Sequence, residues 1–255
     1  MITGSELGAI MPRLPEVKRT TYLPFLQAAM AEFGIDRPAR TAAFVAQLAH
    51  ESGELRYMEE IWGPTPAQRR YEPPSTLADK LGNTESGDGK RFKGRGPIQI
   101  TGRSNYKRFG DLLGLDLMAE PARAAVPDVA FRIAGLFWSK KGLNDLADLA
   151  TPEAFREITR RINGGFNGLA DRERLYAAAR QVLGVATRQL QPRTRASRAR
   201  PGHPARALPP EPSFDRGYEA IRTTRRRSKT RTTRVRKHQP ATRRKGAKRR
   251  ARKAR

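Results

Sequence analysis

The stretch TAAFVAQLAHESGE, residues 41–54, decides the fold of this chain. Its first ten residues are apolar on almost every side, which is typical of a helix buried in a protein core. Glu51 follows at the end of that helix, and Ser52-Gly53 directly after it favour a turn. The sequence therefore predicts a carboxyl group at the mouth of a buried helix.

A second glutamate, Glu60, follows nine residues later in RYMEEI (56–61). In one unbroken helix, nine residues at about 100° each would put the two carboxyl groups on opposite faces, so the chain must turn between them. Burial disfavours the charged form of Glu51 and raises its pKa, whereas Glu60 lies in a more polar stretch that keeps it ionised. Such an acid and base can hydrolyse a glycosidic bond. On spacing alone a solvated surface pair is the more common alternative, and Glu54 and Glu59 compete for either role.

The charge is distributed unevenly along the 255 residues. The net charge is +26, and residues 188–255 alone carry 25 lysines and arginines against three acids. That segment has too few large apolar side chains to offset the entropy of ordering it, so we expect a disordered basic tail. Residues 1–187 are long enough for one domain with a proper core.

Several function classes are excluded by composition. The chain has no cysteine, so disulfides, thiolate nucleophiles and cysteine metal sites are ruled out. Its three histidines include no pair at metal-binding spacing, and neither a metal nor a cofactor is expected. We find no signal peptide and no apolar run near the roughly 20 residues of a membrane span, which favours synthesis in the cytoplasm.

Helical patterns dominate the first 187 residues. We expect helices from Thr20 or Thr21 to Gly34, Pro38 to about His50, Ser104 to Gly114, Pro127 to Gly142, Thr151-Pro152 onward, and Asp171 to Gly184. Strand signals are weak, and only FKGRGPIQIT (92–101) could form a short hairpin. Residues 62–91 are rich in Pro, Gly, Asn and Asp and predict a long loop. We interpret this loop as a cleft wall, with a flexible excursion as the alternative.

Two further motifs, GRGPIQITGRSNY (94–106) and RRINGGFNG (160–168), follow AHESG in chain order. Together with ADRERLYAAARQVLG (170–184), they resemble glycoside hydrolase family 19, which holds plant-type chitinases and many phage endolysins. The resemblance covers residues 20–186, and it is closer to the endolysins because ELRYMEE follows without the chitinase cysteines.

The resemblance implies a mainly α-helical, lysozyme-like domain with a deep cleft and at most a small hairpin. It also implies an inverting mechanism in which Glu51 is the general acid and Glu60 the general base, with Glu59 as the fallback base. An inverting enzyme needs room for a water molecule beside its base, and a hydroxyl can hold that water. By position in the family motif, Thr101 supplies this hydroxyl.

The same resemblance implies that Gln99, Asn105 and Asn163 line the sugar sites and that Arg172 lies near the catalytic acids. Amide side chains both donate and accept hydrogen bonds, which suits an amino sugar. Each residue also has a structural alternative. Asn163 could simply end a helix, Gln99 could satisfy backbone in a turn, and Arg172 could pair with Glu173 or Asp171.

Three other side chains leave a choice between a structural and a functional role. His50, next to Glu51, is interpreted as a packed or hydrogen-bonded structural residue and not as a proton carrier. Trp62 and Tyr71 could stack on sugar rings or could contact each other as a local staple.

These observations predict a monomeric inverting glycoside hydrolase that cleaves β-1,4 links in a cell-wall polymer containing N-acetylglucosamine. Peptidoglycan is the favoured substrate and chitin the alternative, with the enzyme acting at the wall after release from the cell. The rival is a protein that acts through its basic tail. Such a tail binds nucleic acid, lipopolysaccharide, teichoic acid or anionic membrane, and charge does not choose among them.

Overall fold

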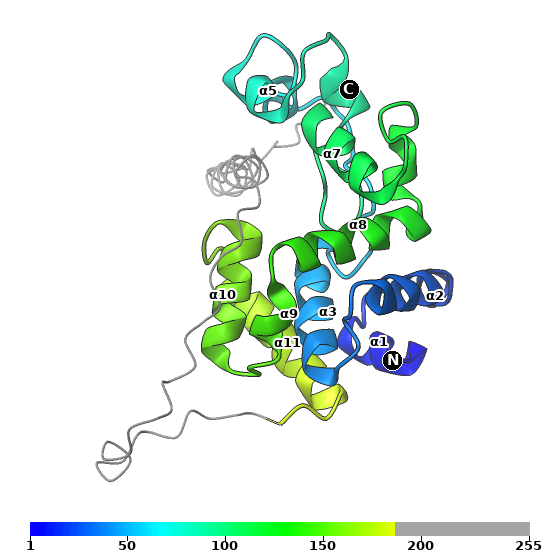
Figure 1. The fold of residues 1–255 in the computed structure, drawn as a ribbon, viewed down its shortest axis with the longest axis vertical. Helices are drawn as coiled ribbons and strands as arrows, with labels where there is room; N and C mark the ends of the chain where they lie inside the picture. Colours follow the sequence, from blue (N-terminus) through cyan, green and yellow to red (C-terminus); the bar gives the residue numbers. More distant parts are fainter. Residues whose placement is uncertain (187–255) are drawn as a thin grey trace, which may run out of the picture.

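Residues 1–186 are the part of the chain described by the computed structural model, and they are mainly helical (Figure 1). Within them no strand forms, and two isolated antiparallel bridges join Glu59 to Arg95 and Arg95 to Ile100. The predicted fold class is thus confirmed. The tail predicted at 188–255, and the domain boundary placed at residue 187, lie outside the described residues. The helices are α1 (Gly4–Ile10), α2 (Glu16–Glu32), α3 (Pro38–Ser52), α4 (Pro66–Arg69), α5 (Thr76–Leu81), α6 (Asp88–Arg91), α7 (Arg103–Leu113), the 3-10 helix η1 (Pro121–Ala125), α8 (Pro127–Lys140), α9 (Leu143–Ala147), α10 (Pro152–Asn163) and α11 (Leu169–Val182).

The core is built around α3, which lies in the middle of the helices in Figure 1. Every residue of α3 from Thr41 to Ala49 is buried, as the sequence predicts for this helix. The helix packs against α11, while α2 packs against α8. Phe44 of α3 meets Trp138 of α8 edge to face, with 5.2 Å between the ring centroids. Neighbouring helices therefore bury the middle of α3, whereas His50 and Glu51 near its C-terminal end are partly exposed.

The helix boundaries follow the sequence signals in most places. Proline occupies the first helical position of α3, α8 and α10, where its missing N–H costs nothing. Two starts were predicted wrongly. Helix α2 begins at Glu16, before the predicted cap. Thr21 lies inside this helix, where its hydroxyl donates to the carbonyl of Val17. Helix α11 begins at Leu169, ahead of Asp171.

Residues 62–91 are not the irregular loop that the composition predicts. They contain α4, α5 and α6, each of four to six residues and hence too short to show helical periodicity. Tyr71, Leu77 and Leu81 form a second small apolar cluster, against which Trp62 packs. The rings of Trp62 and Tyr71 lie 6.1 Å apart, which supports the local staple.

The hairpin expected at 92–101 is reduced to one bridge between Arg95 and Ile100, and residues 94–96 also pair with residues 58–60 as a narrow ribbon. Glu60 N–H donates to the carbonyl of Gly94 (2.8 Å), and Gly96 N–H donates to the carbonyl of Met58 (2.8 Å). Arg95 in turn pairs with Ile100 through two backbone hydrogen bonds of 3.0 and 2.9 Å. The ribbon fixes the chain soon after it leaves α3.

Candidate active site

A tight turn separates the two predicted catalytic glutamates. Helix α3 carries Glu51 in its last turn and ends at Gly53, which has φ 62°. Glu54 and Leu55 continue with φ 63° and 56°, a left-handed conformation that side chains other than glycine rarely adopt. The hydroxyl of Ser52 accepts from the N–H of Leu55 at 2.7 Å and so holds the turn. The chain thus reverses where Ser52-Gly53 predicted it.

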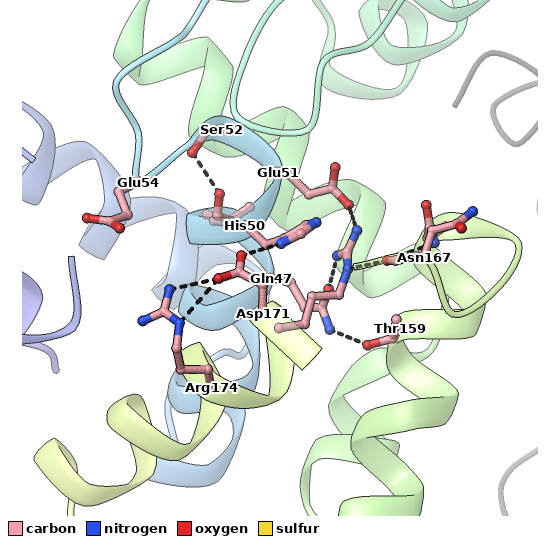
Figure 2. Close-up of polar contacts among 12 residues, drawn as sticks. Gln47, His50, Glu51, Ser52, Glu54, Thr159, Asn167, Asp171 and Arg174 are labelled. Atoms are coloured by element: carbon pink, nitrogen blue, oxygen red, sulfur yellow. Dashed lines mark hydrogen bonds and ion pairs between the residues drawn. The ribbon is translucent and has the colours of Figure 1, made fainter. Parts of the chain in front are cut away.

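Arg172 of α11 holds the carboxylate of Glu51 through an ion pair. The guanidinium is fully buried, and the Glu51 side chain is 13% exposed. Arg172 also donates to the side-chain oxygen of Gln47 and, at 3.3 Å, to the carbonyl of Asn167. Of the predicted alternatives for Arg172, neither holds: Asp171 pairs with His50 and Arg174 (Figure 2), and Glu173 pairs with Arg156.

The environment of Glu51 contains two opposing effects. Burial favours the neutral acid, as expected from its place at the end of α3. The positive charge of Arg172, which the sequence argument about burial did not include, stabilises the ionised carboxylate.

His50, beside Glu51, is partly buried and contacts Asp171 of α11. Its Nδ1 lies 2.6 Å from a carboxylate oxygen of Asp171 (Figure 2). Burial first, and the charge of Arg172 second, hold the pKa of His50 below its usual value, while Asp171 and Glu51 act in the opposite direction. A neutral imidazole facing a carboxylate donates through Nδ1–H. This geometry agrees with the structural interpretation of His50.

Glu60 lies on the ribbon and is 8% exposed. One carboxylate oxygen accepts from the N–H of Gly94 at 3.0 Å, and the other accepts from the amide of Gln68 at 3.2 Å. The Gln68 amide also donates to the carbonyl of Ile61, so its orientation is fixed. Two donors, one for each oxygen, suit an ionised carboxylate, which can only accept hydrogen bonds.

The neighbouring glutamates face other partners. Glu54 is 2% exposed and accepts from the backbone N–H and the Nε of Arg13, both at 2.7 Å. Figure 2 shows its side chain pointing away from Glu51. Glu59 is 45% exposed and pairs with Arg95 at 2.9 Å and Lys93 at 3.3 Å. Glu54 thus has a structural role, since it holds Arg13. Glu59 points to the opposite side of the ribbon from Glu60.

Thr101, Gln99 and Asn105 form one hydrogen-bonded group directly after the ribbon. The Thr101 hydroxyl donates to the Gln99 carbonyl (3.0 Å), and the Asn105 amide donates to the Thr101 carbonyl (2.8 Å). The amide of Gln99 donates to the carbonyl of Gly96 at 2.8 Å, as the turn-stabilising alternative predicts. Thr101 is 1% exposed, so its hydroxyl lies beneath the surface.

Asn163 belongs to the same network as Glu51. It is the last residue of α10, and Gly164 ends the helix with φ 65°. Its amide donates to the carbonyls of Gly165 (3.1 Å) and Asn167 (3.4 Å), and the second of these also accepts from Arg172. The helix-end alternative is therefore correct, and the same residue helps to shape the loop that holds Arg172.

Three site residues were missed by sequence reasoning: Gln47, Gln68 and Asn167. Gln47 offered a signal, because it is a polar residue in an otherwise apolar helix and stands one turn before Glu51. Gln68 also belongs to a capping box with Thr65, a T-x-x-Q pattern visible in the sequence. Asn167 acts through its backbone carbonyl, for which the sequence carries no side-chain signal.

Residues 1–186 contain neither a cluster of metal-binding side chains nor a membrane-spanning helix. These residues hold no group of three or more His, Cys, Asp or Glu side chains placed to bind a metal ion. In the same range, no helix combines the length and the apolar character needed to cross a bilayer.

Comparison of the sequence with known proteins gives consistent matches. A family model described as chitinase class I matches residues 20–150, about half of the chain. A glycosyl hydrolase family 19 domain-containing protein of Haemophilus influenzae is 34% identical over 176 residues, which are 60% of this chain and 84% of that protein. An endochitinase of Arabidopsis thaliana is 37% identical over 162 residues, which are 63% of this chain and 52% of the plant protein. The chain thus spans about half the length of this plant relative.

The fold also matches solved structures. Chitinase C from Streptomyces griseus superposes with a TM-score of 0.57 at 25% identity, covering 73% of this chain and 78% of that one. A second bacterial family 19 chitinase gives a TM-score of 0.56 at 23% identity, covering 73% and 96%. These likenesses confirm the lysozyme-like helical architecture, and the sequence matches confirm the predicted enzyme class, a glycosidase. The chain belongs to glycoside hydrolase family 19.

Proposed function

We propose that this glycosidase cleaves β-1,4 links next to N-acetylglucosamine in a cell-wall polymer, with inversion at the anomeric carbon. The observation that carries the proposal is the separate fixation of two carboxylates. Glu51 is held at the end of a core helix by Arg172, and Glu60 is held on the ribbon by Gly94 and Gln68. Two carboxyl groups in different, rigid environments are what an acid and a base require.

In the proposed reaction, Glu51 gives its proton to the leaving-group oxygen as the glycosidic bond breaks. Glu60 takes a proton from the water that attacks the anomeric carbon from the opposite face. The hydroxyl of Thr101 donates to a backbone carbonyl and keeps its lone pairs as acceptors for that water. Each turnover consumes one water molecule and returns both carboxyl groups to their starting protonation through solvent.

Glu51 must carry its proton against the attraction of Arg172. Without substrate its side chain is 13% exposed, so water still reaches the carboxyl group. A sugar bound over Glu51 excludes that water, and desolvation favours the neutral acid. Substrate binding thereby supports protonation at the moment when the acid is needed.

Peptidoglycan is the substrate that we favour, on the likeness of AHESGELRYMEE to endolysins and the absence of cysteine from the chain. Chitin is the alternative, and the name of the Arabidopsis endochitinase relative supports it. Both polymers present the same acetamido sugar, so the pair Glu51 and Glu60 serves either one. We further propose that the enzyme is made in the cytoplasm and acts at the wall after release.

Substitution of the two glutamates tests the catalytic assignment. Glu51→Gln and Glu60→Gln should each lower turnover by about 10²–10⁴-fold, because general acid or base catalysis supplies that factor. Glu59→Gln is the matched control: it removes the same charge one residue away and should retain most activity. Turnover of chitin and peptidoglycan fragments by each purified variant measures the effect. Activity lost in Glu59→Gln and kept in Glu60→Gln would make Glu59 the base.

The anomer of the product tests the mechanism. A single displacement by water turns a β-link into an α-anomeric product. Proton NMR recorded before mutarotation should show the α-anomer first. An initial β-anomer would mean a retaining mechanism and a different role for Glu60.

A further inference from the structure

A pocket lies beside the ribbon, and its lining includes Lys93 and Arg95, the two residues with which Glu59 pairs. Its volume is about 600 Å³, and its charged lining residues are Lys90, Arg91, Lys93, Arg95, Arg123 and Glu120. Successive side chains of an extended segment point to opposite faces, so Glu59 faces Lys93 and Arg95 while Glu60 faces Gly94. The pocket is thus separate from the predicted catalytic side, although both share the ribbon.

The pocket concentrates positive charge that nearby acids do not neutralise. Glu59 pairs with Lys93 and Arg95, and Glu120 approaches Arg123 only to 4.0 Å. Glu72 adds a third carboxylate, which accepts from the backbone N–H groups of Gly87 (2.9 Å) and Lys90 (3.2 Å), so three carboxylates lie near five cationic side chains. Across residues 1–186, Lys90 and Arg91 form no ion pair, and both are exposed. The region 1–187 has a net charge of only +4, so a large part of its excess is gathered here.

The form of the pocket suits a small anionic group. The side chains of Lys93 and Arg95 are largely buried, which strengthens their electrostatic attraction for an anion relative to fully solvated charges. Guanidinium groups match the planar geometry of carboxylate and phosphate oxygens. A neutral sugar would use none of this charge.

We propose that this pocket binds an oxyanion, a carboxylate or phosphate, carried by an anionic cell-wall glycan. The inference rests on the proposed function, because it names which polymer the same enzyme would hold. Peptidoglycan carries carboxylates on its lactyl and peptide groups, and teichoic acids carry phosphates, whereas chitin is uncharged. The pocket therefore favours an anionic wall polymer over chitin.

Substitution of Glu59 should change anion binding in the opposite direction to substitution of a pocket cation. Its carboxylate already occupies Lys93 and Arg95, so an incoming oxyanion competes with it for the same cations. Removal of that charge by Glu59→Gln should tighten anion binding. Removal of a pocket cation should weaken it.

Binding is measured on the full chain in a Glu51→Gln background, so that substrates are not consumed. Inorganic phosphate is titrated while the amide signals of residues 87–95 and 119–123 are followed by NMR. Lys90→Glu should weaken phosphate binding by about two- to fivefold for each unit of charge removed, the range for partly exposed ion pairs, and this substitution changes the charge by two units. Lys140→Glu, with the same charge change at the far end of α8, is the matched control and should leave it unchanged.

Three outcomes would each overturn the proposal. Lys90→Glu and Lys140→Glu could weaken phosphate binding equally, Glu59→Gln could weaken it, or the amide signals at the pocket could fail to shift during the titration. A peptidoglycan fragment, the same fragment with amidated carboxylates, a teichoic acid fragment and a chitin oligomer then distinguish the sources. A larger response of the amide signals at the pocket to a short oligonucleotide than to every glycan would also overturn it. Turnover of a neutral oligosaccharide by the wild-type chain tests the glycosidase proposal separately, because that substrate has no group for the pocket.

Discussion

Gln47 connects the predicted acid to the rest of the core. It stands one turn before Glu51, is 1% exposed, and donates its amide to the hydroxyl of Thr159 at 2.8 Å (Figure 2). Its side-chain oxygen accepts from Arg172. Because the same guanidinium holds Glu51, the amide of Gln47 positions the acid through Arg172.

Gln47→Met should therefore affect both stability and rate. It leaves a buried Arg172 donor without its acceptor, which costs about 1–3 kcal/mol of unfolding free energy. The value of kcat should fall about tenfold, while KM for a neutral oligosaccharide changes little, because no sugar contact is removed. Denaturant unfolding and steady-state kinetics measure the two effects.

Gln47→Glu serves as the conservative comparison, since it keeps an acceptor for Arg172. It should restore part of the stability but shift the pH profile of kcat, because a second carboxylate shares the guanidinium with Glu51. A loss of stability with no change in kcat or in its pH profile would reduce Gln47 to a purely structural residue.

The lowered pKa of His50 makes stability depend on pH. In the unfolded chain His50 titrates near its ordinary value of about 6.5, above its value in the folded protein. As the pH falls below that value, the unfolded state binds a proton that the folded state does not, so the unfolding free energy falls. His50→Gln has no group that titrates at this position, so its unfolding free energy does not fall in this way. The difference in unfolding free energy between wild type and His50→Gln should therefore be smaller at pH 5.5 than at pH 7.5.

Urea unfolding at the two pH values measures this change. His203 and His238 are present in both proteins, so their contributions cancel. A difference that stays constant or widens at low pH would show that Asp171 outweighs burial and Arg172 at this imidazole.

Contacts of site residues could be predicted where a family motif includes both partners. They could not be predicted where the partners lie far apart in the chain and belong to no motif. Glu51 and Arg172 were expected near one another, and they form an ion pair. The partnership of Gln47 with Thr159 joins residues 112 positions apart and depends on how α3 meets α10. No local pattern records such a contact, so it required the fold.

At the scale of elements, the turn after α3 is fastened by the N-terminal part of the chain. Arg13, which follows α1, holds the buried carboxylate of Glu54 through its backbone N–H and its guanidinium. Glu54 and Leu55 are both in the left-handed conformation, which costs about 1 kcal/mol or more for each such residue. The ion pair helps to offset that cost.

Glu54→Ala should lower the unfolding free energy by about 1.5–2 kcal/mol, the lower part of the range for hydrogen bonds to a charged group, because Arg13 is 57% exposed. It should also lower activity moderately by loosening the turn between Glu51 and Glu60. Thermal unfolding and turnover are the measurements. Glu16→Ala, which removes an 82% exposed carboxylate, is the control and should change neither. Unchanged stability in Glu54→Ala would show that the turn is held by its backbone alone.

Element boundaries could be predicted where helices are long and capped. Helix α10 begins at Pro152 after Thr151, whose side chain accepts from Ala154 N–H at 3.2 Å, as expected. The short helices between Trp62 and Arg91 show no periodicity, because each has little more than one turn, although the capping box of Thr65 and Gln68 at the start of α4 gave a local signal.

At the scale of the whole molecule, charge divides the chain more sharply than hydrophobicity does. Residues 188–255 carry a net charge of +22. We predict that removing them leaves residues 1–187 active on small neutral oligosaccharides, while activity on intact walls falls strongly. The reason is electrostatic attraction to an anionic surface, which salt screens within about 8 Å at physiological ionic strength.

Turnover of both substrates by the full chain and by residues 1–187, over a salt series, measures this effect. For the full chain, activity on walls should decline as salt rises, whereas activity on oligosaccharides should not. An equal loss on both substrates after truncation would mean that the tail supports the domain itself.

The different supports of the two glutamates have a consequence for divergence among relatives. Glu51 is built into a helix surrounded by core, where almost any substitution is felt by packed neighbours. Glu60 sits on a ribbon fastened largely by main-chain groups, including the N–H of Gly94, which side-chain mutation cannot remove. Apart from Gln68, which holds the Glu60 carboxylate, residues 62–91 can therefore vary and reshape what the enzyme accepts, while Glu51 and Glu60 keep their places.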